Sequence, residues 1–246
     1  MMRIMLVVML CVFANSMAFG NLTTYYEDDF SGETLNPSWQ PLGAGAYNLV
    51  DGDLEFATVA GDFVDDYESY WGAPQHAYVV ALPSFVTEFS AITRVRYNTP
   101  YDQYHQVDIL AYQDNDTYVK NGYQMGGTYL THTWLSEYPG TYSEDEVFAE
   151  TQTDYFWLRI DWDSETLTYD TYFSASMTAD PDEVNWTALG ALYNPMPYPM
   201  IGIGGWNGAA EFGPLAEFDY FRVQIVPEPA SIAALAALLA ICARRR

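Results

Sequence analysis

The sequence predicts an all-β protein built from two packed antiparallel sheets. Many short segments alternate apolar and polar residues with a period of two, which is typical of strands that have one buried face. Gly, Pro, Asn and Asp residues that favour turns separate these segments. Of the 246 residues, 50% are hydrophobic and 17% are aromatic, a composition that excludes a disordered chain. Because β-sandwiches of about 200 to 250 residues often form one unit, we expect a single domain.

The clearest alternation runs from residue 155 to 162, where Phe156, Leu158 and Ile160 share one face. A turn at 163–165 and a second alternating segment at 167–173 predict a hairpin. Further strands are predicted over residues 89–97, 104–112, 129–135, 200–206 and 217–223. The pair Asn121-Gly122 predicts a type I′ hairpin turn. A short helix is expected within 180–192, capped by Asp180.

The two ends of the chain are typical of targeting segments. Residues 1–20 contain Arg3, an apolar run and then small residues, which predicts a secretory signal peptide cleaved after Ala18 or Gly20. The other end has an apolar stretch over 230–243, and a helix of that length rises only about 21 Å, less than the ~30 Å hydrocarbon core. The predicted segments are therefore 1–20, a β-sandwich domain at 21–226, and a terminal segment at 227–246.

The terminal segment resembles the PEP-CTERM sorting signal of Gram-negative bacteria. The resemblance rests on Pro227, Glu228 and Pro229, the short apolar helix, and the final residues Arg244, Arg245 and Arg246. It implies recognition by an exosortase, a transient anchor in the inner membrane, and delivery to the cell surface or the extracellular matrix. An ordinary tail anchor is the alternative.

Charge and cysteine content narrow the function further. The chain has 33 acidic and 9 basic residues, a net charge of −24 that excludes nucleic acid as the obvious partner. Cations, neutral sugars and other proteins remain as possible binding partners. Cys11 and Cys242 both lie in the terminal segments, so the domain between them has neither a disulfide bond nor a thiol nucleophile.

The first and last strands resemble those of concanavalin A-like jelly rolls, a group that includes laminin-G-like modules and family-16 glucanases. The resemblance rests on the segments 28–32, 50–54 and 217–223. It implies a jelly-roll sandwich and a structural calcium ion held by Asp219 and by a backbone oxygen of Gly45. Asp219 also shares its parity with apolar residues of the last strand, and a buried carboxylate needs a cation or donors. A hydrogen-bonded Asp at a strand end is the alternative.

No catalytic motif is evident. The glucanase pattern E-x-D-x-x-E is absent, and the nearest acidic groups, at 144–150 and 161–165, lack its order. The three histidines, His76, His105 and His132, have no spacing that indicates a triad or a metal site. These observations argue against catalysis.

Aromatic and polar side chains that share strand faces predict a sugar-binding surface. The candidate ligand-binding residues are Tyr104, Gln106, Asp108 and Tyr112 on one strand and Arg94 and Arg96 on the preceding strand. The sequence therefore predicts an exported, non-catalytic protein that binds polysaccharide or another matrix component. The alternatives are a divergent glycoside hydrolase or lyase of the same fold, and a purely structural surface protein.

Overall fold

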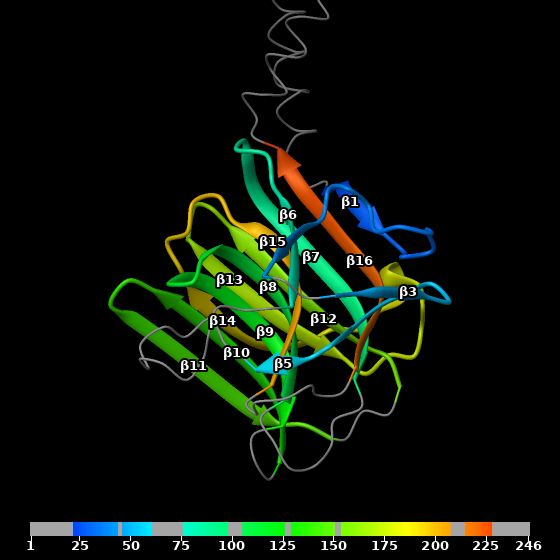
Figure 1. Cartoon of the computed structure of the whole chain (residues 1–246). Helices are drawn as coiled ribbons and strands as arrows, with labels where there is room; N and C mark the ends of the chain where they lie inside the picture. Colours follow the sequence, from blue (N-terminus) through cyan, green and yellow to red (C-terminus); the bar gives the residue numbers. More distant parts are fainter. Residues whose placement is uncertain are drawn as a thin grey trace, which may run out of the picture.

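The computed structural model describes residues 22–43, 46–60, 76–97, 105–125, 129–150, 154–207 and 215–227, whose strands form two sheets that pack face to face (Figure 1). Sheet A has the spatial order β14 (Thr187–Tyr193), β13 (Thr168–Ser174), β12 (Phe156–Asp163), β7 (Val86–Tyr97), β16 (Leu215–Pro227), β4 (Asp53–Ala57) and β3 (Asn48–Val50), with β1 (Thr23–Asp28) also paired to β16. Sheet B has the order β11 (Thr141–Phe148), β10 (Leu130–Tyr138), β9 (Thr117–Met125), β8 (His105–Asp114), β15 (Met200–Asn207), β6 (Ala77–Ala81) and β2 (Gln40–Leu42), with β5 (Val59–Ala60) parallel to β15. The predicted two-sheet antiparallel sandwich is confirmed.

The core lies between the two sheets and follows the predicted alternation. In β12, Phe156, Leu158 and Ile160 are buried against it, and in β8 the same holds for Val107 and Ile109. Successive strand residues point to opposite faces, so their neighbours lie on the outer faces of the two sheets. Outer face here means the side of a sheet that points away from the other sheet.

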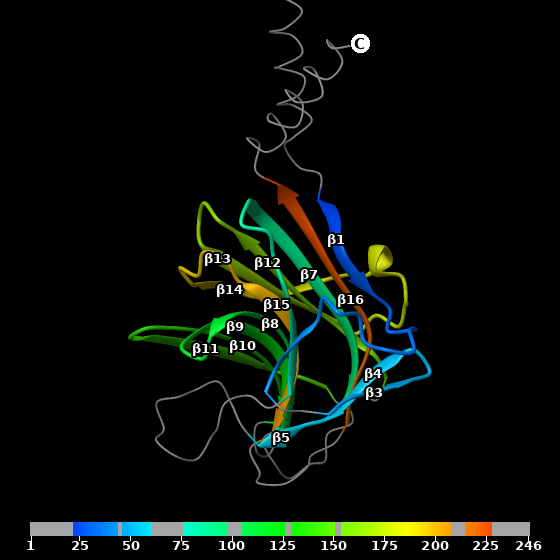
Figure 2. The same ribbon diagram turned by 45° about the horizontal axis from the view of Figure 1, so that its top comes forward.

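Strand β16 organises sheet A because three strands share its two edges. β7 pairs along one edge, while β4 and β1 divide the other. Thr23 of β1 pairs with Ile225 of β16, so the two ends of the described domain lie side by side (Figures 1 and 2). The predicted signal peptide and the residues Glu228, Pro229, Arg244, Arg245 and Arg246 lie outside the described residues and stay predictions. The described residues contain no helix with the length and apolarity needed to cross a membrane.

The predicted turn at Asn121-Gly122 is wrong, because both residues lie in the middle of β9. The chain turns instead at 115–116, between β8 and β9. Asn121 is fully buried, and its amide nitrogen donates hydrogen bonds across the sandwich to the carbonyls of Arg159 (3.0 Å) and Tyr172 (2.9 Å). A Cβ atom at position 122 would overlap the Asp108 carboxylate, so glycine is needed there for close approach rather than for a turn.

The predicted helix within 180–192 shrinks to a single 3₁₀ turn, η1 (Pro181–Glu183). Asp180 caps it as expected and accepts a hydrogen bond from the Asp182 amide. From Thr187 onward the range belongs to strand β14, which pairs with β13. Pairing with the edge of β13 therefore outweighs the local sequence signal for the start of a helix.

Candidate active site

The candidate active site lies on the outer face of sheet A, where β16 contains a β-bulge. Phe218 pairs with Val95 and Tyr220 pairs with Arg94, so Asp219 is the extra residue between them. Before the bulge Ala216 and Phe218 face the core, and after it Phe221 and Val223 do. The expectation that Asp219 belongs to the core row is therefore wrong, because the bulge changes the parity of the strand at this residue.

A second carboxylate is placed beside the bulge by a tight turn. Asp51 (φ 54°) and Gly52 (φ 95°) join β3 to β4 with positive φ angles, as a type I′ hairpin requires. Asp53 is consequently the first residue of β4. Phe218 pairs with Leu54 on antiparallel strands, so Asp219, which follows Phe218, and Asp53, which precedes Leu54, come next to each other beyond this pair. The two carboxylates come from segments far apart in the sequence.

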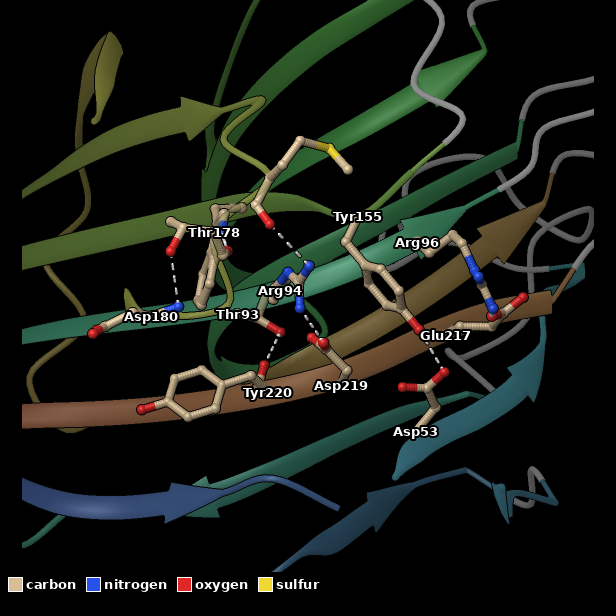
Figure 3. A network of polar contacts seen from close by, with 12 residues as sticks. Asp53, Thr93, Arg94, Arg96, Tyr155, Thr178, Asp180, Glu217, Asp219 and Tyr220 are labelled. Atoms are coloured by element: carbon tan, nitrogen blue, oxygen red, sulfur yellow. Dashed lines mark hydrogen bonds and ion pairs between the residues drawn. The ribbon is translucent and has the colours of Figure 1, made fainter. Parts of the chain in front are cut away.

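Two arginines and a tyrosine connect these carboxylates (Figure 3). Arg94 Nη1 lies 2.5 Å from Asp219 Oδ2, and Arg96 forms an ion pair with Glu217. The Tyr155 ring lies between the two guanidinium groups, 4.6 Å from that of Arg94 and 4.9 Å from that of Arg96. The Tyr155 hydroxyl donates a 2.6 Å hydrogen bond to Asp53 Oδ2. Arg94 therefore holds Asp219, Arg96 holds Glu217, and Tyr155 holds Asp53.

The segment from Met177 to Trp186 covers part of this face and limits its contact with water. The Trp157 indole nitrogen donates to the Thr178 carbonyl (3.1 Å), and Trp157 packs with Ile92 and Val184. As a result, the Asp219 side chain is only 20% exposed and the Arg94 side chain 12%.

Burial changes the acidity of the site. Removal from water raises the pKa of Asp219 to about 6, an effect that the nearby Arg94 opposes and the Asp53 charge reinforces. Burial and the neighbouring Glu217 also raise the pKa of Glu55 on β4. Asp219 Oδ1 is buried and has no hydrogen-bond partner among the described residues. A carboxyl group with these properties can hold a proton near neutral pH and donate it to a substrate.

The structure divides the predicted ligand-binding residues between the two sheets. Arg94 and Arg96 belong to the outer face of sheet A, whereas Gln106, Asp108 and Tyr112 lie on the outer face of sheet B. The expected exposed polar surface is not found at Gln106 and Asp108, whose exposed fractions are only 8% and 1%. Gln106 accepts a hydrogen bond from Lys120. Tyr104 lies outside the described residues.

The predicted calcium ion stays a prediction. Gly45 lies outside the described residues, and the Arg94 guanidinium already compensates the charge of Asp219. The described residues contain no cluster of three or more His, Cys, Asp or Glu side chains that could hold a metal ion.

Comparisons with known proteins show similarity in fold. No family model and no curated protein matches the chain. The GH43 protein BlXynB of Bacillus licheniformis has a TM-score of 0.62 at 17% identity, covering 81% of this chain and 39% of that one. The xylan β-1,4-xylosidase of Bacillus halodurans gives 0.60 at 16% identity, covering 80% and 38%. The CBM2 module of the evolved Dit protein of Lactobacillus casei phage J-1 gives 0.59 at 9%, covering 85% and 98%. The chain spans less than two fifths of the length of these two hydrolases.

These comparisons correct the predicted function. The expectation of a non-catalytic protein that binds polysaccharide is contradicted, because the structural neighbours include several GH43 glycoside hydrolases. At 17% identity or less this likeness shows the fold alone, so the alternative of a divergent glycoside hydrolase is a proposal.

The sequence identified some members of the candidate site but missed others. Arg94, Arg96 and Asp219 were singled out, although for other roles. Asp53 and Tyr155 were not, because their hydrogen bond joins residues 102 positions apart. The change in apolar parity between Phe218 and Phe221 is the signal that could have revealed the bulge.

Proposed function

We propose that this protein is a glycoside hydrolase that acts on xylan-type polysaccharide. The observation that carries the proposal is the pair of carboxyl groups on β16 and β4, of which Asp219 has a pKa raised to about 6. Glycoside hydrolysis needs one carboxyl group that is protonated and a second that is ionised.

The two carboxyl groups have separate roles in this proposal. Asp219 donates its proton to the glycosidic oxygen as the bond to the sugar breaks. Asp53, held by the Tyr155 hydroxyl, is the carboxylate that accepts a proton from the water molecule whose oxygen bonds to the anomeric carbon as the glycosidic bond breaks. When Asp219 loses its proton, the Arg94 guanidinium at 2.5 Å stabilises the resulting charge.

The substrate class comes from the comparisons. One structural neighbour is described as a xylan β-1,4-xylosidase, and another is a GH43 enzyme with an engineered active site that displays both endo-xylanase and exo-arabinofuranosidase activity. The fold alone is shared at these identities, so xylan is part of the proposal. The sorting signal predicted at 227–246 belongs to it as well, since delivery to the cell surface would bring the domain to external polysaccharide.

The experiment is a reducing-end assay on the purified chain with xylan, and with cellulose as the comparison. We expect release of reducing ends from xylan by the wild type and its loss in Asp219→Asn. Glu88→Gln is the matched control, because Glu88 is an exposed carboxylate on β7 of the same sheet. No release from xylan by the wild type, or equal release by wild type and Asp219→Asn, would contradict the proposal.

A further inference from the structure

A cavity lies on the outer face of sheet A, beside η1. Its volume is about 290 Å³, near the lower end of the range for ligand pockets. Ser90 and Ile92 of β7 and Gln224 of β16 contribute to its walls. A space of this size suits one sugar unit rather than a long chain.

Two arginines flank this cavity in register. Arg159 of β12 and Arg222 of β16 both pair with Ile92 of β7, so they stand on either side of this buried residue. Neighbouring strands are about 4.8 Å apart, which separates the two backbones by roughly 10 Å. The domain at 21–226 contains only five basic residues, and two of them line this one cavity. The placement favours a ligand that carries negative charge.

The guanidinium of Arg222 has unused capacity to donate hydrogen bonds. Its side chain is 11% exposed, and Nη2 lies 2.9 Å from Oδ1 of Asp182, a residue whose side chain is 74% exposed. Arg222 Nε is buried and has no hydrogen-bond partner in the part of the chain that the structure describes. The Asp182 side of this ion pair is solvated and contributes little, so a ligand carboxylate can replace Asp182 and also accept from Nε.

Trp186 supplies an apolar surface at the same cavity. It is half-buried, packs against Trp157, and lies with its ring centre 5.5 Å from the Arg159 guanidinium. Arg159 is itself paired through two contacts to Asp161. An aromatic ring beside fixed polar groups is the usual arrangement for holding the apolar face of a sugar.

From these observations we infer that the cavity binds a single uronic acid unit, with its carboxylate on Arg222 and its ring on Trp186. The net charge of −24 repels a polymer that carries an acid on every sugar. The substrate class is therefore a largely neutral polysaccharide with scattered uronic acid units. This inference rests on the proposed function for its link to hydrolysis, but it concerns a site apart from Asp219 and Asp53 and is measured by binding.

The test is an NMR titration of the purified chain with methyl glucuronide, methyl glucoside and sulfate at matched ionic strength. We expect the indole signal of Trp186 to shift with the glucuronide and to shift much less with the other two. Arg222→Gln should weaken glucuronide binding roughly tenfold, as expected for a lost charged hydrogen bond.

Two neighbouring carboxylates provide a matched pair of variants. Asp182→Asn removes the competitor of the ligand and should tighten glucuronide binding several-fold. Glu183→Gln makes the same change in net charge one residue away, and Glu183 does not line the cavity, so binding should stay unchanged. Equal affinity for glucuronide and glucoside, equal affinity for glucuronide and sulfate, or equal effects of these two variants would overturn the inference. Because no hydrolysis is measured, failure of the proposed function would leave this result interpretable.

Discussion

Asp219 lies 2.5 Å from Arg94, yet the pKa of its carboxyl group is raised to about 6. Pairing with a cation alone would lower this pKa, so burial and the nearby charge of Asp53 outweigh the guanidinium. The bulge in β16 makes this possible, because it places Asp219 on the outer face of sheet A beneath the segment that starts at Met177. Asp219 can therefore donate a proton, and Arg94 can stabilise the carboxylate that is left.

Asn121 offers a direct test of the fold. In a type I′ turn, Asp replaces Asn readily. In β9, however, Asn121→Asp removes two donors to the carbonyls of Arg159 and Tyr172 and places a charge in the core. We expect a loss of at least about 3 kcal/mol in the free energy of unfolding, measured by urea denaturation. Wild-type stability would instead indicate an exposed turn at this position.

The strands could be predicted because their pattern is local. In β12, every second residue is apolar, and the pattern alone fixes which side chains enter the core. The position of Asp219 could not be deduced in the same way, because one inserted residue in β16 reverses the parity that the prediction used. The turn predicted at Gly122 is wrong for a related reason. A glycine can allow a tight turn or, as here, a close approach to another residue, Asp108, and the sequence does not distinguish the two.

The candidate site was predicted only in part because its contacts are long-range. Arg94 and Arg96 alternate on one strand, which the sequence shows, but their partners Asp219 and Glu217 lie more than 120 positions away. The pairing of β7 with β16 brings them together. No local pattern in a single sequence predicts that pairing.

His132 should make the fold sensitive to acid. Burial lowers the pKa of His132 to about 4 from the ordinary value of 6.5. Between these values the unfolded chain binds the proton and the folded chain does not, so stability falls as the pH drops from 6.5 towards 4. The contribution is roughly 3 kcal/mol. Asp219 acts in the opposite sense, because its raised pKa makes the folded state bind a proton more readily below pH 6.

His132→Phe isolates this effect, since the new ring can keep the contact with Phe173. Urea unfolding of wild type and variant at pH 7 and pH 4.5 measures the difference. The variant should lose less stability on acidification than the wild type. Identical losses would show that His132 does not resist protonation in the folded state.

Calcium binding at Asp219 is tested by thermal unfolding. If the resemblance to concanavalin A-like proteins extends to this residue, millimolar calcium raises the melting temperature more than magnesium does at matched ionic strength. A hundredfold excess over Kd corresponds to about 2.7 kcal/mol. Asp219→Asn should remove the calcium-specific part. Equal responses of wild type and variant would mean that calcium only screens the negative charge.

The Tyr155 hydroxyl is expected to position Asp53. Tyr155→Phe keeps a ring between the two guanidinium groups but removes the 2.6 Å hydrogen bond to the carboxylate. We expect kcat on xylan to fall roughly tenfold with little change in KM or melting temperature. Tyr26→Phe is the matched control, because the Tyr26 hydroxyl also bonds a carboxylate, that of Asp28, on the same sheet. Similar losses in both variants would argue against a specific role for Tyr155.

The pH profile of xylan hydrolysis tests the central claim most directly. If Asp219 is the proton donor, kcat/KM of the wild type falls about tenfold per pH unit above pH 6, where this carboxyl group loses its proton. Asp219→Asn should lose roughly 100-fold or more of the activity at pH 5 and show no such limb, whereas Glu88→Gln keeps both the rate and the limb. Hydrolysis by Asp219→Asn at the wild-type rate, with the same dependence on pH, would contradict the account.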